Sequence, residues 1–254
     1  MAHAHGYTAM LFDLDPSQLL LTGLIFIWTG FVRSGLGFGG AALGLPLLLL
    51  IDDHPVHWLP VIGFHLLFFT SLTLRTRLDN VDWNYLMRSS RFIVPAAIVG
   101  VFGLLNLPNT WLLLMIYSIT LFYALIWLFN RAIHSHHRMV DRLLLVLGGY
   151  IAGTSLTGAP LMVAVYMRNV ARHQLRNTLF VLWFVLVVIK MSTFAVLGVD
   201  LQALSALALL PLAAIGHLLG LKTHEAILHN DALFKRWIGG GLLVISVIGL
   251  WHLA

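Results

Sequence analysis

Long apolar stretches separated by short polar ones dominate this chain. The apolar runs cover roughly residues 19–32, 35–51, 56–74, 92–107, 111–130, 143–168, 178–198, 202–221 and 238–253. A helix needs about 20 apolar residues to cross a bilayer, and several runs have this length. The pattern predicts an all-α integral membrane protein with roughly 8 to 10 membrane segments.

Two of the runs do not fit one helix each. Residues 19–51 are too long for a single span, and Arg33, Ser34 and a glycine run interrupt them. Residues 143–168 are too short for two spans, and the segment 153–160 breaks them with Gly, Thr, Ser and Pro. Each run is predicted to form a Gly/Pro-broken hairpin. Whether these hairpins cross the membrane fully or re-enter it is left open at this stage.

Composition supports a membrane protein. Of the 254 residues, 59% are hydrophobic and only 10% are charged, whereas soluble domains carry about 25% charged residues. A water-soluble enzyme, a disordered protein and a disulfide scaffold are excluded on this basis. The chain has no Cys, so disulfides, thiolate metal sites and Cys nucleophiles are excluded as well.

The distribution of charge predicts the topology. Thirteen of the 15 Lys and Arg residues lie in four loops, at 75–91, 131–142, 168–177 and 222–237. The segments between them hold no Lys or Arg but several Asp residues, at 1–18, 52–55, 108–110 and 199–201. By the positive-inside rule the basic loops are cytoplasmic, and both termini are external. The expected location is a membrane that the chain crosses several times.

This topology divides the chain into two similar halves of opposite orientation. Each half has a broken hairpin followed by three transmembrane helices. The predicted organisation is an external N-terminal segment (1–18), a first membrane repeat (19–130), a cytoplasmic linker (131–142) and a second membrane repeat (143–254). Inverted-topology repeats with interrupted segments at matching positions are typical of secondary transporters, whose site lies where the interruptions meet.

The two interruptions are alike in residue type, since both 30–46 and 149–166 are rich in glycine and contain a proline. With these motifs, residues 19–253 resemble the sulfite exporter TauE/SafE family of bacterial membrane transporters. The resemblance extends to Val81-Asp82-Trp83, to Arg176-Asn177-Thr178 and to the Gly216…Gly220 segment.

The resemblance implies transport of sulfite, organosulfonates or other small sulfur-containing or organic anions, with export as the expected direction. The chain departs from the family at Thr157-Gly158-Ala159-Pro160, where many relatives repeat a double glycine. This departure leaves the identity of the anion open.

An anion inside a membrane needs donors that cost little to bury. Helix N-termini offer free N–H groups, glycines let the backbone approach a ligand, and hydroxyls are neutral donors. The alternative is that the glycines only permit close helix packing. The predicted substrate-binding residues are Arg33, Ser34, Gly35, Gly37, Gly39, Gly40, Thr154, Ser155, Thr157, Gly158 and Lys190.

Four ionisable residues within the apolar runs have two interpretations each. Arg33 either extends to the cytoplasmic face or serves as the counter-charge of the substrate. Lys190 lies about 12 Å from the external end of its helix, where an ionisable residue indicates function unless its stem reaches the surface. His65 and His217 are candidates for proton coupling, although a neutral His bonded between helices explains them equally well.

No metal site and no cofactor are expected. The cluster His134, His136 and His137 is interpreted as part of a solvated loop. A phosphate-binding glycine loop is missing, so no nucleotide-driven domain is expected, and neither is nucleic-acid binding. The sequence thus predicts a non-enzymatic secondary transporter that works by alternating access, with the small anion and the lipid bilayer as its partners. An intramembrane enzyme that uses Ser155, or an uptake permease for a different small solute, is the alternative, and the oligomeric state is left open.

Overall fold

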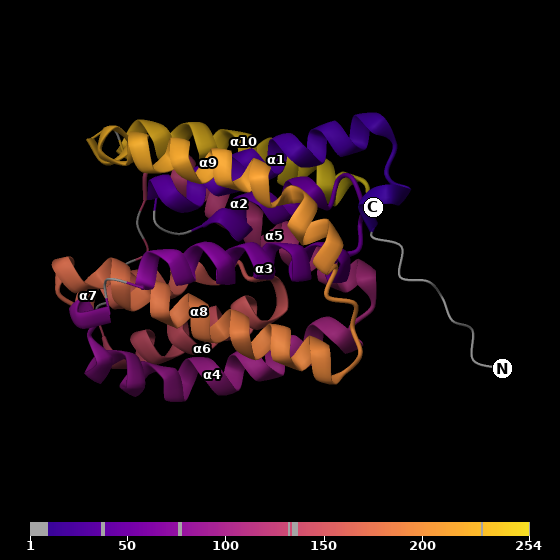
Figure 1. The fold of residues 1–254 in the computed structure, drawn as a ribbon. Helices are drawn as coiled ribbons and strands as arrows, with labels where there is room; N and C mark the ends of the chain where they lie inside the picture. The colour runs from indigo at the N-terminus through magenta and orange to yellow at the C-terminus, as the bar shows by residue number, and fades with distance from the viewer. Residues whose placement is uncertain are drawn as a thin grey trace.

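The computed structural model describes residues 10–36, 39–75, 78–131, 133, 137–229 and 231–253, and within them all regular structure is helical (Figure 1). This confirms the predicted all-α class. Two short 3-10 helices, η1 (Met10–Asp13) and η2 (Leu78–Asn80), accompany ten α-helices. The α-helices are α1 (Pro16–Leu36), α2 (Gly40–Leu48), α3 (Pro55–Leu74), α4 (Trp83–Asn106), α5 (Asn109–Leu128), α6 (Arg138–Ser155), α7 (Ala159–Asn169), α8 (Arg172–Val196), α9 (Ala203–His229) and α10 (Asp231–Trp251).

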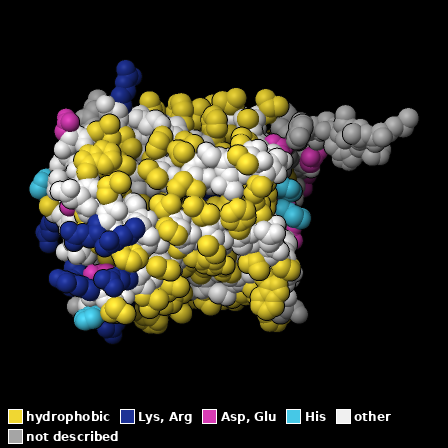
Figure 2. All heavy atoms as spheres, turned by 90° about the horizontal axis from the view of Figure 1, so that it is seen from below, with side chains coloured by type: hydrophobic (Ala, Val, Ile, Leu, Met, Phe, Trp, Pro, Cys, Tyr) yellow, Lys and Arg dark blue, Asp and Glu magenta, His cyan; other side chains and the backbone are white. Residues whose placement is uncertain are grey.

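Seven of these helices are long and apolar enough to cross a membrane, namely α1, α3, α4, α5, α8, α9 and α10. Large apolar side chains project outward from them, among them Leu20, Val99, Trp111 and Trp251. The space-filling view shows apolar side chains between two polar ends, with Lys and Arg gathered at one end and with His, Asp and Glu at both (Figure 2). The chain is a multi-pass membrane protein.

The helices of the two halves follow the same order. A hairpin with one long and one short arm, α1–α2 or α6–α7, is followed by three helices of 20 to 27 residues. The packing has the same regularity, because α1 pairs with α9 of the other half and α6 pairs with α4 in return. Helix α3 packs on α8, and α5 packs on α10. Neither half therefore forms its packed core alone.

Glycines explain how closely the exchanged helices approach each other. Gly216 and Gly220 of α9 face backbone carbonyl groups of α1, and Gly149 and Gly153 of α6 face carbonyl groups of α4. A Cβ atom at any of these positions would collide with the facing backbone. Small residues four apart are the usual device for close helix contacts in membranes. The close-packing interpretation therefore holds for these four glycines.

The second arm of each hairpin is a short helix. These return arms, α2 and α7, have 9 and 11 residues, which corresponds to about 14 and 17 Å of helix. The hydrocarbon core is about 30 Å thick. Neither return arm can span it as a single helix, whereas α1 alone is long enough to cross. The hairpin tips use backbone conformations with positive φ, at Gly39 (86°) and Leu156 (58°).

Candidate functional site

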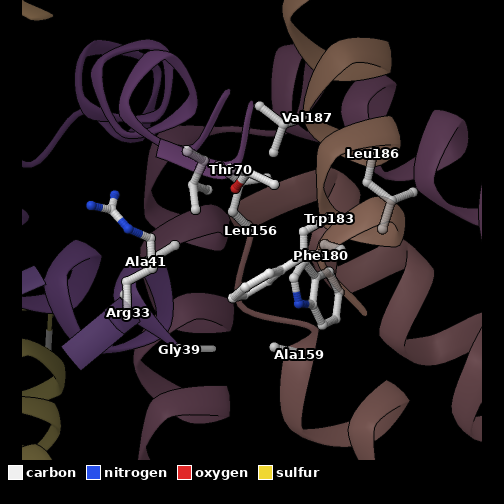
Figure 3. Close-up of a pocket in the computed structure, with 13 residues that line it drawn as sticks. Arg33, Gly39, Ala41, Thr70, Leu156, Ala159, Phe180, Trp183, Leu186 and Val187 are labelled. Carbon is white, nitrogen blue, oxygen red and sulfur yellow. The ribbon is translucent and has the colours of Figure 1, made fainter. Parts of the chain in front are cut away.

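The tips of both hairpins face one pocket, together with α3 and α8 (Figure 3). Arg33 and Ala41 of the first hairpin lie on one side of it, and Phe180 and Trp183 of α8 lie on the other. The full lining is Arg33, Gly39, Gly40, Ala41, Leu66, Thr70, Ala152, Leu156, Ala159, Phe180, Trp183, Leu186 and Val187. The two interruptions of the sequence thus meet in space.

Arg33 is the principal charge at this pocket. It is only 9% exposed, and its Nη2 atom is buried without a hydrogen-bond partner. The guanidinium carbon lies 4.2 Å from the centre of the Phe69 ring. Arg33 also lines two further pockets, one beside His65 and one beside His217. The side chain is therefore held inside the helix bundle rather than extended to the surface.

The pocket beside His217 contains a second guanidinium, that of Arg176. Arg176 lies in the first turns of α8, and its guanidinium carbon is 5.4 Å from the centre of the Phe180 ring. The remaining lining comes from α1, α3, α8 and α9, namely Arg33, Ser34, Phe69, Thr70, Thr73, Phe180, His217 and Leu221. Two arginines from different halves therefore share one cavity.

Lys190 occupies a different place from Arg33. It is 1% exposed, and its ammonium group donates a hydrogen bond of 3.1 Å to the carbonyl oxygen of Thr154, in the last turn of α6. It is not among the lining residues of the pocket in Figure 3. The hydroxyl of Thr154 donates to carbonyl groups of its own helix, at Tyr150 and Ile151.

The remaining predicted hydroxyls are engaged within the protein. Ser34 and His217 share a hydrogen bond of 2.5 Å between Oγ and Nδ1. Ser155 and Thr157 share one of 2.6 Å, and both side chains are buried. The Ser155 hydroxyl also donates to the carbonyl oxygen of Ile151, so Thr157 donates the bond between the two hydroxyls. Because a hydroxyl has a single donor hydrogen, Ser155 and Thr157 keep acceptor capacity only.

The predicted glycines have different environments. Gly39 and Gly40 line the pocket, and Gly35 is buried one turn earlier in α1. Gly158 precedes α7, where a Cβ would collide with the carbonyl group of Gly148 on the facing arm. Gly37 lies outside the described residues.

The two intramembrane histidines flank Arg33. His65 is buried, its Nε2 atom is 2.7 Å from the carbonyl oxygen of Ala206, and its ring meets Phe26 edge to face. His217 is half-buried and packs on Phe69 with 4.8 Å between ring centres. His65 thus joins α3 to α9, while His217 lies in the pocket that holds both arginines.

Sequence reasoning missed several residues of the site. Thr70, Phe180 and Trp183 lie within apolar runs and give no separate signal, yet the Trp183 Nε1 donor is buried without a partner at the pocket. Arg176 was assigned only to a basic loop. Its signal was the Arg-Asn-Thr motif, whose Thr178 hydroxyl accepts a hydrogen bond of 2.9 Å from the backbone N–H of Asp82 in the other motif.

Two interrupted hairpins whose tips meet at a buried pocket are an arrangement typical of membrane transporters. The family model described as "Sulfite exporter TauE/SafE" matches residues 22–249. The chain belongs to this family, which consists of membrane transporters, and the resemblance of the motifs is confirmed. No curated protein and no solved structure is detectably similar to the chain.

Proposed function

We propose that this protein is a secondary transporter that exports a small oxyanion, sulfite or an organosulfonate, across the bacterial inner membrane. The observation that carries the proposal is Arg33, whose buried Nη2 atom has no hydrogen-bond partner and whose side chain lines the pocket between the two hairpin tips. A buried charge is costly unless it is paired. Among the described residues no carboxylate forms an ion pair with Arg33, so a bound anion would supply the counter-charge.

Helix geometry adds neutral donors to this charge. Helices α2 and α7 both begin at the pocket, with Gly40 and Ala41 in the first turn of one and Ala159 in the first turn of the other. The first N–H groups of a helix have no intrahelical partner, and the N-terminus carries a partial positive charge. An oxyanion between Arg33 and these two helix starts would thus meet donors from both halves.

Arg176 would be the first pocket-lining cation that an anion meets when it enters from the basic end of the molecule. The pocket that it shares with Arg33 contains Ser34, Thr73 and His217, all able to form hydrogen bonds. In our proposal the basic end is cytoplasmic, as the positive-inside rule requires. An inside-negative potential then favours export of an anion.

Alternating access would arise from the exchanged packing of the halves. If the repeats are inverted, as the charge pattern predicts, the two halves can exchange conformations. The same set of contacts between them then forms in the outward-open and in the inward-open state. Rocking of α1–α2 with α9 against α6–α7 with α4 would then expose the pocket to one side at a time. Both helix pairs pack closely through glycine and can move as units.

An intramembrane enzyme is supported less well. Ser155, the predicted nucleophile of that alternative, bonds to Thr157 rather than to a histidine. Ser34 does contact His217, but a nucleophile and base also need a group that orients the base. None of the described ion pairs involves His217.

The test is anion flux in proteoliposomes, with sulfite, several sulfonates and small carboxylates, with and without an imposed pH gradient. Wild-type protein should give saturable flux of a sulfur oxyanion or sulfonate that is recovered chemically unchanged. Arg33→Gln should lower flux by about 100-fold, since removing one member of a buried charge pair costs about 3 kcal/mol. The matched control is Arg172→Gln, the same change at an exposed position of α8.

Three results would contradict the proposal. Unaltered flux in a folded Arg33→Gln variant would remove Arg33 from the site. If no anion moves through folded wild-type protein, the substrate class is wrong, and conversion of the anion to a product would favour the enzyme.

A further inference from the structure

A second cluster of polar side chains lies far from Arg33, in the turn that joins α2 to α3. Asp52, His54 and His57 each direct one ligand atom toward a common point, and these atoms lie within 4.8 Å of one another. One carboxylate oxygen of Asp52 is 2.9 Å from His54 Nδ1, and the other is 2.6 Å from His57 Nδ1. We propose that these three residues bind a divalent first-row transition metal ion of the zinc class.

The donor set determines the class of the ion. Two imidazole nitrogens and one carboxylate suit Zn²⁺ and its neighbours, whereas Ca²⁺ and Mg²⁺ prefer all-oxygen sites. Tetrahedral zinc with bonds of about 2.0 Å keeps its ligand atoms about 3.3 Å apart. The two Asp–His contacts, of 2.9 and 2.6 Å, involve different oxygens of Asp52, and the ligand atoms lie within 4.8 Å of one another, so they would shift by at most about 1.5 Å to reach this spacing. A fourth position would remain for water or another ligand.

The backbone that carries the ligands is held in place from several sides. The indole Nε1 of Trp58 donates a hydrogen bond of 2.9 Å to the carbonyl oxygen of Asp52. The side-chain amide of Asn109, at the start of α5, donates one of 2.8 Å to the carbonyl oxygen of Asp53. His57 lies in the first turn of α3, after Pro55. Ligands fixed in this way lose little freedom when a metal binds.

Charge and exposure also suit a cation from solution. The Asp53 carboxylate lies 2.9 Å from His54 Nδ1, and Asp200 is within electrostatic range of His57. These extra negative charges offset the positive end of α3. The His54 and His57 side chains are 56% and 45% exposed, against 18% for Asp52. The site is therefore open to an ion while its carboxylate is shielded.

The position of the cluster determines which parts of the fold a bound metal would connect. Helix α3 has 20 residues and runs from this cluster to its end beside Arg75, so the cluster lies at the end opposite to the basic loops. A bound ion would tie the turn after α2 to the first turn of α3. Both helices line the anion pocket further along their length. Metal binding would therefore restrain the first hairpin without occupying the pocket itself.

This inference departs from the expectation of no metal site, which considered only the histidines of the central linker. His134 and His136 of that linker lie outside the described residues. The sequence signal that was missed is Asp-x-His-x-x-His across 52–57, in which the turn and the first helical residues bring three ligands together.

The experiment measures Zn²⁺ binding to the full-length protein, purified in detergent with a tag that contains no histidine and stripped with a chelator. Competition with a chromophoric chelator gives affinity and stoichiometry, and Co²⁺ absorption reports the coordination geometry. We expect one Zn²⁺ per chain at this site, a rise in Tm on adding Zn²⁺, and no such rise with Mg²⁺. His54→Gln, His57→Gln and Asp52→Asn should each weaken binding by at least about 100-fold, since loss of supporting residues alone costs 10- to 100-fold.

The matched control is the triple variant H134Q/H136Q/H137Q, which should keep the binding and the Tm response. A variant counts only if its Tm in metal-free buffer equals that of the wild type, and His54→Gln, at the most exposed ligand, is the variant least expected to disturb folding. Binding that survives in a folded His54→Gln or Asp52→Asn variant, or that disappears only in the linker variant, would overturn the proposal. Because no flux is measured, the outcome is independent of anion transport.

Discussion

Lys190 donates a hydrogen bond from its ammonium group to the backbone carbonyl oxygen of Thr154, at 3.1 Å. The contact joins the middle of α8 to the last turn of α6, in the second hairpin. Carbonyl groups at the end of a helix lack intrahelical partners and carry partial negative charge, so a buried cation is favourable there. Lys190 is therefore placed to hold the tip of this hairpin rather than to contact an anion in the pocket.

Replacing Lys190 by Met should destabilise the protein by about 1–3 kcal/mol, the usual cost of leaving a buried acceptor without its donor. The measurement is denaturation in detergent, combined with sulfite flux. We expect a lower Tm and a lower maximal flux with an unchanged KM, because the anion loses no direct contact. Lys222→Met, at an exposed position of α9, is the matched control and should leave both quantities unaltered.

The opposite pattern would return Lys190 to the substrate site. A variant with wild-type Tm and a raised KM for the anion would show that the ammonium group contacts the substrate during transport, as the sequence alone had predicted.

Much of the architecture could be predicted because a membrane restricts it. Apolar runs of helix length permit little besides transmembrane helices, and the glycines of the two broken runs marked both hairpins. The helix lengths of α2 and α7 could not be predicted, since no residue in 40–51 signals that the helix stops at Leu48. The short return arms therefore became evident only in three dimensions.

The site was predicted less completely than the fold. Arg33 was recognised because an arginine in an apolar run is conspicuous. Arg176 was not, because its place in the Arg176-Asn177-Thr178 motif does not show that α8 turns its side chain toward a pocket. Thr70 and Trp183 depend on the packing of α3 on α8, a contact between halves that hydropathy does not encode.

The glycine contacts between α1 and α9 predict that two Gly→Ala substitutions differ strongly in their effect on stability. Gly216→Ala places a Cβ against the carbonyl oxygen of Ile27 and should cost about 1–3 kcal/mol, as overpacking of a tight contact does. Gly240→Ala, in α10, meets no atom within 4 Å and should be neutral or slightly stabilising. Thermal denaturation of both variants in the same detergent checks this. Equal Tm values would mean that the α1–α9 crossing is looser than described.

Two other glycines allow the effect of backbone strain on stability to be distinguished from an effect on transport. Gly39 and Gly198 have φ angles of 86° and 72°, and a Cβ at either position would meet no atom within 4 Å. Alanine should therefore cost about 1–2 kcal/mol at each, through the left-handed backbone alone. Only Gly39 lies at the anion pocket, so only Gly39→Ala should raise the KM for sulfite, while both variants lose similar stability. A raised KM in Gly198→Ala, in the connection between α8 and α9, would show that strain acts on transport from a distance.

His217 and His65 predict different responses to an imposed pH gradient. His217 bonds to Ser34 in the pocket that holds Arg33 and Arg176, so a proton on its ring would change the charge next to the anion. His217→Gln keeps a side chain able to form hydrogen bonds but cannot titrate. We expect it to retain flux without a gradient and to lose the response to one.

His65 donates to the Ala206 carbonyl oxygen between helices, so His65→Gln should lower Tm and leave the response of the flux to the gradient intact. If His217→Gln responds to the gradient as the wild type does, protons are coupled elsewhere or not at all. If His65→Gln alone abolishes the response, the coupling site lies on the α3 side of Arg33, where the Nδ1 atom of His65 is buried without a hydrogen-bond partner.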